Sequence, residues 1–340
     1  MLAMKLLTLL TGSLFPFSNM LRIASSSDCG GAKHQECRRQ GIGSDILARY
    51  LRCATFWMFA YLAYAVLPSP GVLAREYALR WVALVTLCNL VIVHVVYGLW
   101  HHILYVCEWT RARVRNRKFD PRNLREDGSL DESLGYSPLR DRRLTTVGVV
   151  VASLVECFVL HRWATGQWES YGDFWARPCR SCGLLAAIPY WADAHFFFAH
   201  RALHPWCPRR RSGLDPGRAL YRHVHSVHHR SYNTGPWSGL AMHPVEQLLF
   251  FSSIVVPVAQ HPLHLYFGLF YKLLAPLAGH DGFGEPGGGG YFHFLHHAHF
   301  DVNYGSPAVP LDWLFGSYCD GKKPMAQDQV GASAAVDSAR

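Results

Sequence analysis

The sequence is poor in charged residues. Only 17% of its 340 residues are Asp, Glu, Lys or Arg, while 50% are hydrophobic. Because about a quarter of the residues in an ordinary soluble domain are charged, this shortage argues against a purely soluble protein. The same apolar content excludes disorder as the main state of the chain.

Several motifs are also missing. The sequence contains no H-E-x-x-H, which disfavours a soluble zinc protease, and no internal repeat of about 20 to 50 residues. Among its 10 cysteines, only Cys179 and Cys182 form a C-x-x-C pair. One such pair is a weak sign of zinc or redox chemistry, and cysteines scattered through apolar runs are more often small buried hydrophobes.

Long apolar runs are what the chain has instead. The four longest predict membrane helices and cover residues 46–67, 79–107, 145–160 and 183–204. Two shorter runs follow, at 245–259 and 263–278. They are near or below the length that spans a bilayer, so they form either a shallow hairpin or two full crossings.

The net charge of +9 fits this arrangement. Arginine-rich segments occur at 21–45, at 108–143 and after His204, and successive crossings place all three on one face of the membrane. Basic residues near membrane ends favour the cytoplasm. The charge is therefore explained by membrane sidedness rather than by nucleic-acid binding. We predict an all-α, multi-pass bundle of membrane helices, in the endoplasmic reticulum, with its basic face in the cytoplasm.

Histidine is the most unusual feature of the chain. There are 20 histidines, and 15 of them lie between residues 195 and 299. Most fall in three clusters, which are His200 with His204, then His225, His228 and His229, then His293, His296 and His297. Side chains at i, i+3 and i+4 share a helix face, so each cluster projects imidazoles toward one region.

Neutral imidazole is the commonest metal-binding side chain and suits iron, zinc and copper. The predicted topology returns all three clusters to the cytoplasmic side, where they can form one site. Eight histidines exceed the four to six ligands of a single ion, so we predict two metals. Isolated histidines at membrane boundaries are usually interfacial or core residues instead, as we expect for His34, His94, His101, His102 and His161.

The flanking residues extend the pattern. The stretch from Asp193 to His204 resembles D-x-x-F-Y-W-x-H-R-x-x-H, with Phe197 and Phe198 in place of Tyr-Trp, and the second cluster is H-x-x-H-H. The third cluster is followed by N-Y-G, beginning at Asn303. In these features residues 145–320 resemble the fatty acid hydroxylase and sterol desaturase superfamily of membrane-bound di-iron oxygenases.

This resemblance implies that the eight clustered histidines bind two non-heme iron ions. It also implies a further ligand between the second and third clusters, for which His280 is the best candidate and His243 and His299 are weaker ones. Asp193 and Asn303 are candidates for orienting the ligands from behind, as metal-bound histidines usually require, and Asp281 is a more distant one. Simple capping or loop hydrogen bonding is the competing interpretation for these three residues.

The resemblance further implies that O2 is the co-substrate and that a lipid is hydroxylated or desaturated. A sterol, a sphingoid base or a fatty acyl chain would fit. The one G-x-G-x-x-G spacing, from Gly282 to Gly287, follows an apolar run rather than a predicted strand, so it does not indicate a dinucleotide-binding unit. We therefore expect electrons from a separate donor, cytochrome b5 or a similar reductase chain. A non-catalytic metal- or heme-binding membrane protein and a histidine-dependent transporter remain as alternatives.

The predicted organisation has four parts. Residues 1–45 form a targeting or linker segment, and 46–144 hold membrane helices and a basic loop outside the resemblance. Residues 145–320 form the hydroxylase-like domain, and 321–340 form a disordered tail.

Overall fold

The computed structural model describes residues 53–66, 72–207, 214–255 and 260–321. The chain divides into two units, residues 1–67 and 68–340. In the first unit the described element is α4 (Ala54–Val66). The predicted segment 1–45 and nearly all of the predicted tail lie outside the described residues. Every regular element within the described ranges is helical, which confirms the predicted all-α class.

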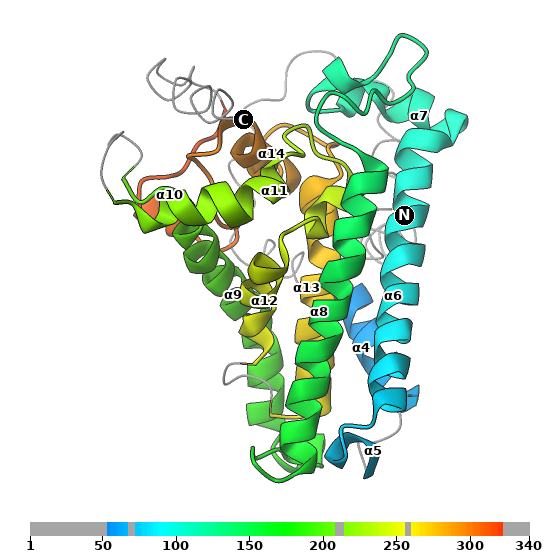
Figure 1. Cartoon of the computed structure of the whole chain (residues 1–340), viewed down its shortest axis with the longest axis vertical. Coiled ribbons are helices and arrows are strands. Elements are labelled where there is room, and N and C mark those ends of the chain that lie inside the picture. The colour runs from blue at the N-terminus through cyan, green and yellow to red at the C-terminus, as the bar shows by residue number, and fades with distance from the viewer. Residues whose placement is uncertain (1–52, 67–71, 208–213, 256–259, 322–340) are drawn as a thin grey trace, which may run out of the picture. The chain divides into compact units, whose positions relative to one another are not determined.

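The second unit contains long helices joined by short helical pieces (Figure 1). Its α-helices are α5 (Val72–Arg75), α6 (Leu79–His101), α7 (Glu108–Val114), α8 (Pro138–Ala164), α9 (Pro178–Ala202), α10 (Pro216–Leu220), α11 (Ser226–His229), α12 (Pro244–Phe251), α13 (Pro262–His280), α14 (Gly289–His299) and α15 (Leu311–Leu314). Two π-helical turns follow α6 and α10, at His102–Val106 and Tyr221–His225. Short 3-10 turns cover Arg115–Arg117, Pro121–Asn123, Phe174–Ala176, Pro236–Leu240 and Ser252–Ile254.

Proline marks the start of the main helices. It occupies the first position of α8, α9, α12 and α13, where a missing N–H removes no intrahelical hydrogen bond. Histidine precedes two of these prolines, and the rings of His243 and His261 accept hydrogen bonds from the backbone N–H groups of Val245 and Leu263. The two dipeptides His-Pro therefore act as helix start signals.

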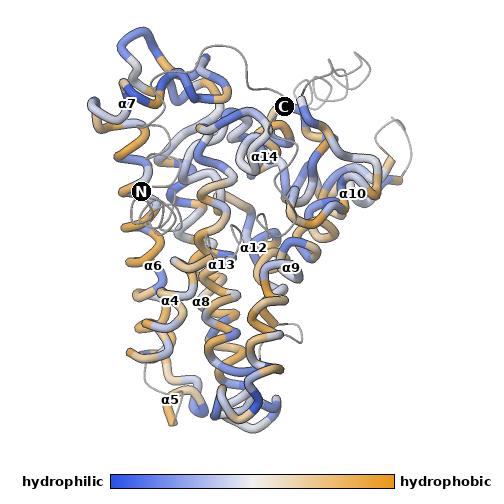
Figure 2. Tube along the Cα trace, turned by 180° about the vertical axis from the view of Figure 1, so that it is seen from behind, coloured by the Kyte–Doolittle hydropathy of each residue, from blue (hydrophilic) through white to orange (hydrophobic). Residues whose placement is uncertain are grey.

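The outer face of α6 is apolar along its length. Its buried side includes Trp81, Val85 and Asn89. Its exposed side carries a stripe with a spacing of three or four residues, namely Leu84, Leu87, Val91, Val95 and Leu99. Helix α6 with its π-helical end (Leu79–Val106) and α8 are long and apolar enough to cross a membrane. Figure 2 shows hydrophobic residues along the long helices and more hydrophilic residues around α7 and α10.

Helix α13 forms the centre of the second unit. Most of its residues are buried, and it packs on α8, α9 and α14. The approach of α14 is close, because a Cβ on Gly290 would lie 3.0 Å from the carbonyl oxygen of Ala278. This contact places the end of α13 beside the start of α14.

The apolar run at 245–259 does not form a long helix in its described part. Helix α12 has eight residues and is followed by one 3-10 turn. Eight helical residues rise about 12 Å, whereas the bilayer core is about 30 Å thick. Of the two predicted arrangements for 245–278, this length favours the shallow hairpin. Crossings by α4, which has 13 residues, and by α9 stay predictions.

Candidate metal centre

Nine buried histidines meet where the ends of several helices come together. His200 lies in the last turn of α9 and His204 follows the helix, while the second cluster lies on the π-helical turn and α11. His280 is the last residue of α13, and the third cluster lies on α14. A π-helical turn inside a longer helix often marks a functional site, because the extra residue re-aims the side chains that follow.

The nine rings form two groups. The first group is His200, His204, His225, His229 and His296, and the second is His228, His280, His293 and His297. Within each group the potential ligand nitrogens all lie within 4.8 Å of one another. The structure thus brings together all eight clustered histidines and the predicted ninth, His280.

Adjacent nitrogens in the first group are very close. The Nε2 atom of His225 lies 2.9 Å from Nε2 of His200 and 3.0 Å from Nε2 of His229. The Nε2 atom of His296 lies 3.1 Å from that of His229. The rings of all these residues are almost completely buried.

The second group converges on His280. Its Nε2 atom lies 3.3 Å from Nε2 of His228 and 3.1 Å from Nε2 of both His293 and His297. Two nitrogens that each bind one ion at about 2.1 Å, at right angles, lie about 3 Å apart. The spacings of both groups therefore match ligand atoms around one ion each.

The opposite ring nitrogens show which atoms carry protons. The Nδ1 atoms of His200 and His296 each lie 2.6 Å from a backbone carbonyl oxygen, of Tyr304 and Val302 respectively. A carbonyl can only accept a hydrogen bond, so Nδ1 is the protonated atom. In a neutral ring, Nε2 then presents a lone pair to the centre of the group.

The same holds for His228 and His280. Their Nδ1 atoms lie 3.4 Å from the carbonyl oxygen of Ala241 and 2.8 Å from that of Pro276. Their Nε2 atoms, 3.3 Å apart, consequently face each other with lone pairs and cannot share a hydrogen bond. A cation bound between the rings would remove this repulsion.

Burial keeps these rings neutral. It lowers the pKa of His225 to about 3, and it lowers the pKa of His296 and His297 well below the ordinary value, with neighbouring histidines adding to the effect. Both ring nitrogens of the completely buried His204 lack a hydrogen-bond partner. An orphaned buried polar atom is costly, and a metal ion would supply the missing partner.

Comparison with known proteins gives these residues a family. Residues 185–317 match the model of the fatty acid hydroxylase family. A very-long-chain aldehyde decarbonylase of Oryza sativa subsp. indica is 32% identical over 153 residues, which is 40% of this chain and 53% of the relative. Residues 185–317, which contain all nine of these histidines, are therefore similar to the fatty acid hydroxylase family. The predicted resemblance is confirmed.

Other relatives of this chain are named for sterol substrates. A putative Delta(7)-sterol-C5(6)-desaturase 2 of Arabidopsis thaliana is 35% identical over 107 residues, covering 29% of this chain and 38% of the relative. Methylsterol monooxygenase 1 of Gallus gallus is 26% identical over 166 residues, which is 44% of this chain and 50% of the relative. The chain spans about half the length of the aldehyde decarbonylase. No solved structure matches it.

Asp193 lies on α9 and contacts α13. Its carboxylate accepts a hydrogen bond of 2.9 Å from Tyr271, and the ammonium of Lys272 donates to the carbonyl oxygen of Ala192 next to it. These contacts fix α9 to α13 one or two turns before His200. The predicted role of Asp193 in orienting an imidazole stays a prediction.

Asn303 holds the segment that follows α14. Its amide donates to the carbonyl oxygens of Phe292 and Cys319, at 3.0 and 2.9 Å, and its carbonyl accepts from the N–H of Cys319 at 2.7 Å. The residues on either side of it, Val302 and Tyr304, supply the carbonyl oxygens that accept from His296 and His200. Asn303 is therefore placed to orient two rings of the first group through the backbone.

This position predicts a measurable effect of Asn303→Ala. The variant loses three hydrogen bonds and places alanine at a φ of +55°, a left-handed conformation that asparagine tolerates better. We expect a loss of about 2 kcal/mol in the free energy of unfolding and a weaker retention of bound metal. Thermal unfolding and metal analysis measure both. Asn303→Gly relieves the backbone strain but still lacks the three hydrogen bonds. Equal stability and equal metal content in wild type and both variants would contradict the proposed role.

Three weaker candidates lie outside both groups. The ring of His243 caps α12 through the N–H of Val245, and His299 is half-buried at the end of α14. The carboxylate of Asp281 accepts from the N–H of Phe283, and burial raises its pKa to about 7. Its position beside His280 fits a loop-shaping role.

The sequence interpretation missed Glu246. Its Oε1 atom lies 2.7 Å from Nδ1 of His225, and both side chains are buried. Carboxylates in this position fix the tautomer and orientation of metal-binding histidines. The available signal was a single acidic residue within an apolar run, because such residues are rarely buried unless they have a partner.

Proposed function

We propose that the protein is a membrane-bound lipid oxidoreductase that holds two non-heme iron ions in its nine histidines. In this proposal it uses O2 to hydroxylate or desaturate a sterol, a sphingoid base or a fatty acyl chain. The observation that supports the proposal is the convergence of nine buried imidazoles as two sets of facing lone pairs. The named activities of the relatives support lipid oxidation as the class of reaction.

The first group would bind one ion and the second group the other. When bound, the two ions would supply the activation of O2 and the oxidation of an unactivated C–H bond, which protein side chains cannot perform alone. This chain would keep the proton of several ligand rings on Nδ1, so that Nε2 stays free for the ion. Backbone carbonyl oxygens accept from Nδ1 of His200, His228, His280 and His296, and Glu246 accepts from Nδ1 of His225.

Phe196 lies on α9, about one turn before His200, and its ring borders the histidine centre. Its ring stacks on His200 with centroids 4.9 Å apart, and it lies 6.0 Å from the ring of His293 in the other group. The ring of Phe250 packs edge-on against it at 5.9 Å. These aromatic side chains would exclude water and contact the apolar body of a lipid entering from the bilayer.

The surroundings in the cell complete the proposal. The protein would be a multi-pass membrane protein of the endoplasmic reticulum with its centre facing the cytoplasm. Its electrons would come from cytochrome b5 or a similar reductase chain. The predicted boundaries at residues 45, 144 and 320 belong to the same proposal.

Metal analysis and lipid analysis together test this function. We expect the purified protein to contain about two iron ions per chain without heme absorbance. Cells that express it, supplied with iron and a cytochrome b5 chain, should accumulate a hydroxylated or unsaturated lipid in an oxygen-dependent manner. Heme in the protein, or metal transport without oxygen consumption or lipid change, would contradict the proposal in favour of the alternative classes.

A further inference from the structure

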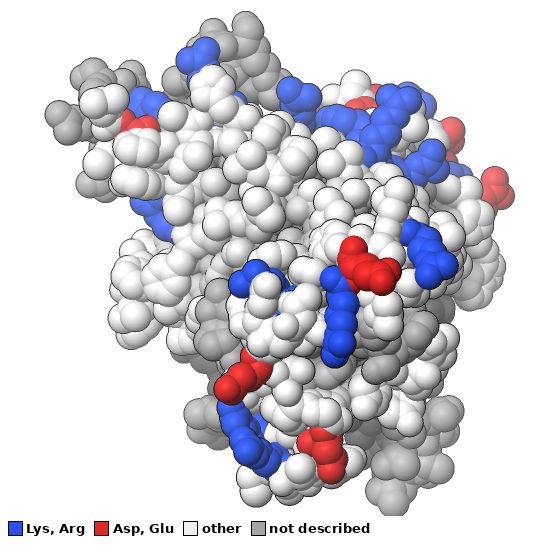
Figure 3. Space-filling model, turned by 60° about the horizontal axis from the view of Figure 1, so that its bottom comes forward, with Lys and Arg blue, Asp and Glu red and all other residues white. Residues whose placement is uncertain are grey.

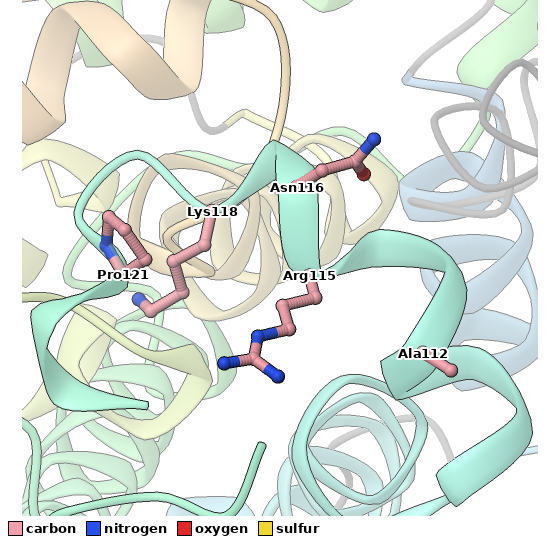
Figure 4. A pocket seen from close by; sticks show the side chains of 5 residues that line it. All are labelled: Ala112, Arg115, Asn116, Lys118 and Pro121. Atoms are coloured by element: carbon pink, nitrogen blue, oxygen red, sulfur yellow. The ribbon is translucent and has the colours of Figure 1, made fainter. Parts of the chain in front are cut away.

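A hollow of about 490 Å³ lies beside α7, at a distance along the chain from the histidines. It is lined by Ala112, Arg115, Asn116, Lys118 and Pro121. Figure 4 shows the side chains of Arg115 and Lys118 extending toward the same space, with Pro121 next to Lys118. The hollow therefore has two cationic groups and one amide in its lining, and no acidic residue.

Among the residues that the structure describes, no carboxylate pairs with Arg115. Its two described hydrogen bonds go to backbone carbonyl oxygens, of Glu126 at 2.9 Å and of Arg125 at 3.3 Å. Carbonyl groups orient the guanidinium but leave its charge in place. The planar guanidinium has five N–H donors, so it retains donors for an anion.

Lys118 forms the buried part of the lining. Its side chain is only 6% exposed. Its ammonium donates to Oδ1 of Asn233 at 3.1 Å and to the carbonyl oxygen of Thr234 at 3.3 Å. An ammonium has three donors, so one remains after these two bonds.

Two acidic residues affect the charge of Lys118, and neither lines the hollow. The carboxylate of Asp120 is held by the guanidinium of Arg122 at 2.6 to 3.0 Å. The carboxylate of Asp281 lies on the inner side, where it accepts from the N–H of Phe283. Asp281 and Asp120 therefore offset Lys118, while the charge of Arg115 faces the hollow without an acidic partner.

The hollow lies just past the end of an apolar surface. The exposed stripe of α6 continues through Val106, which is 50% exposed, to Trp109, which is 61% exposed. The guanidinium of Arg113 lies 3.8 Å above the ring of Trp109. Figure 3 shows a group of Lys and Arg side chains at the upper right, on the α7 side of the molecule. Exposed tryptophan followed by basic residues is typical of the boundary between hydrocarbon and lipid headgroups.

We propose that this hollow binds the phosphate group of a membrane lipid, with Arg115 and Lys118 as its main donors. A phosphate offers several acceptor oxygens and negative charge, which match one guanidinium and one ammonium donor. The location at the end of the lipid-facing stripe favours a phospholipid headgroup over free phosphate. This site is independent of the proposed oxidation chemistry.

Binding here would also affect a part of the histidine-containing domain. Lys118 contacts Asn233 and Thr234 after the second histidine cluster, and the next residue, Phe119, donates its N–H to the carbonyl oxygen of Gly282 at 3.0 Å. The segment 117–119 thus lies against residues 282–284, directly after His280. A bound phosphate would hold this segment in place.

Titration of the purified full-length protein in dodecyl maltoside micelles tests the site. The probes are dioctanoyl phosphatidic acid, dioctanoylglycerol with the same chains but no phosphate, and inorganic phosphate. We expect saturable binding of the phosphatidic acid, no binding of the diacylglycerol, and much weaker binding of inorganic phosphate. Equal affinity for inorganic phosphate and phosphatidic acid would overturn the assignment to a lipid headgroup, and so would saturable binding of dioctanoylglycerol.

A matched pair of variants localises the binding. Arg115→Gln is expected to weaken phosphatidic acid binding about tenfold, because one charge-assisted hydrogen-bonding partner is lost. Arg113→Gln removes the same charge from the same segment but outside the hollow, and should change the affinity less than twofold. Asn116→Asp adds a negative charge at the exposed rim and should also weaken binding. Equal losses for Arg113→Gln and Arg115→Gln would indicate diffuse electrostatic attraction and overturn the proposed site.

Discussion

Replacement of His296 by alanine is expected to abolish formation of the lipid product and to lower iron content. His296 is completely buried, its Nε2 atom lies 3.1 Å from that of His229, and its Nδ1 atom is held by the carbonyl oxygen of Val302. The variant leaves four nitrogens in a group that has five. Loss of an outer hydrogen-bond partner alone costs about 10- to 100-fold in metal affinity or activity, so loss of the ligand should cost at least about 100-fold.

The matched control is His299→Ala, on the same helix. His299 is half-buried and belongs to neither group, so this variant should keep its iron and its product. Thermal unfolding with and without added iron gives a readout that does not depend on turnover. Iron should raise the melting temperature of wild type and of His299→Ala more than that of His296→Ala, because only a ligand that binds the folded state stabilises it. Unchanged product and iron content in His296→Ala would contradict the proposed centre.

Sequence spacing predicted which histidines come together better than it predicted how they are divided between the two groups. Each H-x-x-H-H cluster was expected to point toward one region. In the structure, His225 and His229 belong to one group and His228 to the other. Residues i+3 and i+4 differ by about 100° around a helix, so adjacent histidines diverge. In each H-x-x-H-H cluster the histidines at i and i+4 therefore share one group, and the histidine at i+3 belongs to the other group.

The third cluster shows the same division with the groups exchanged. His293 and His297 belong to the second group, and His296 belongs to the first. Which group each pair joins depends on how α11 and α14 face each other. That relation comes from tertiary packing, which local periodicity does not contain.

His280 was predicted through the resemblance, but its position beside the third cluster could not be predicted without the fold. It is the last residue of α13 and lies 13 residues before His293. The two rings meet because α14 packs closely on α13, with Gly290 against Ala278. A single histidine at the end of an apolar helix has no local pattern that distinguishes it from an interfacial residue.

The basic loop before α8 was predicted only as a cytoplasmic connection. The structure instead places Arg117 in an ion pair of 2.8 Å with Glu285 and buries Lys118 against Asn233. Polar loops carry no periodic signal that reveals such contacts between residues more than 100 positions apart. The segment outside the family match thereby contributes to the surroundings of the histidine-containing domain.

Glu246 is the candidate residue of the metal centre that spacing could not reveal. It lies 21 residues after His225 and on a different helix. Its carboxylate touches Nδ1 of a ring whose Nε2 atom lies 2.9 Å from His200 and 3.0 Å from His229. The orientation of this central ring, and the electron density at its Nε2 atom, consequently depend on Glu246.

Glu246→Gln is therefore expected to weaken iron binding about tenfold, and Glu246→Ala about 100-fold. Glutamine keeps an oxygen that can accept from Nδ1 but loses the negative charge, whereas alanine removes the partner. Competition with an iron chelator measures the dissociation constant of the ion in each variant. The graded order, wild type tighter than Gln and Gln tighter than Ala, is the signature of a charge-assisted bond behind a ligand.

A second buried carboxyl group provides the control for these variants. Glu156 of α8 accepts a hydrogen bond of 2.7 Å from Asn89 and is 1% exposed. Glu156→Gln also replaces a buried carboxyl by an amide. Glu156, however, contacts Asn89 of α6 and not a histidine of the proposed centre. We expect Glu156→Gln to lower the free energy of unfolding and to leave the iron affinity unchanged. Equal iron affinity in wild type and Glu246→Ala would show that His225 does not need its carboxylate, and it would remove Glu246 from the proposed centre.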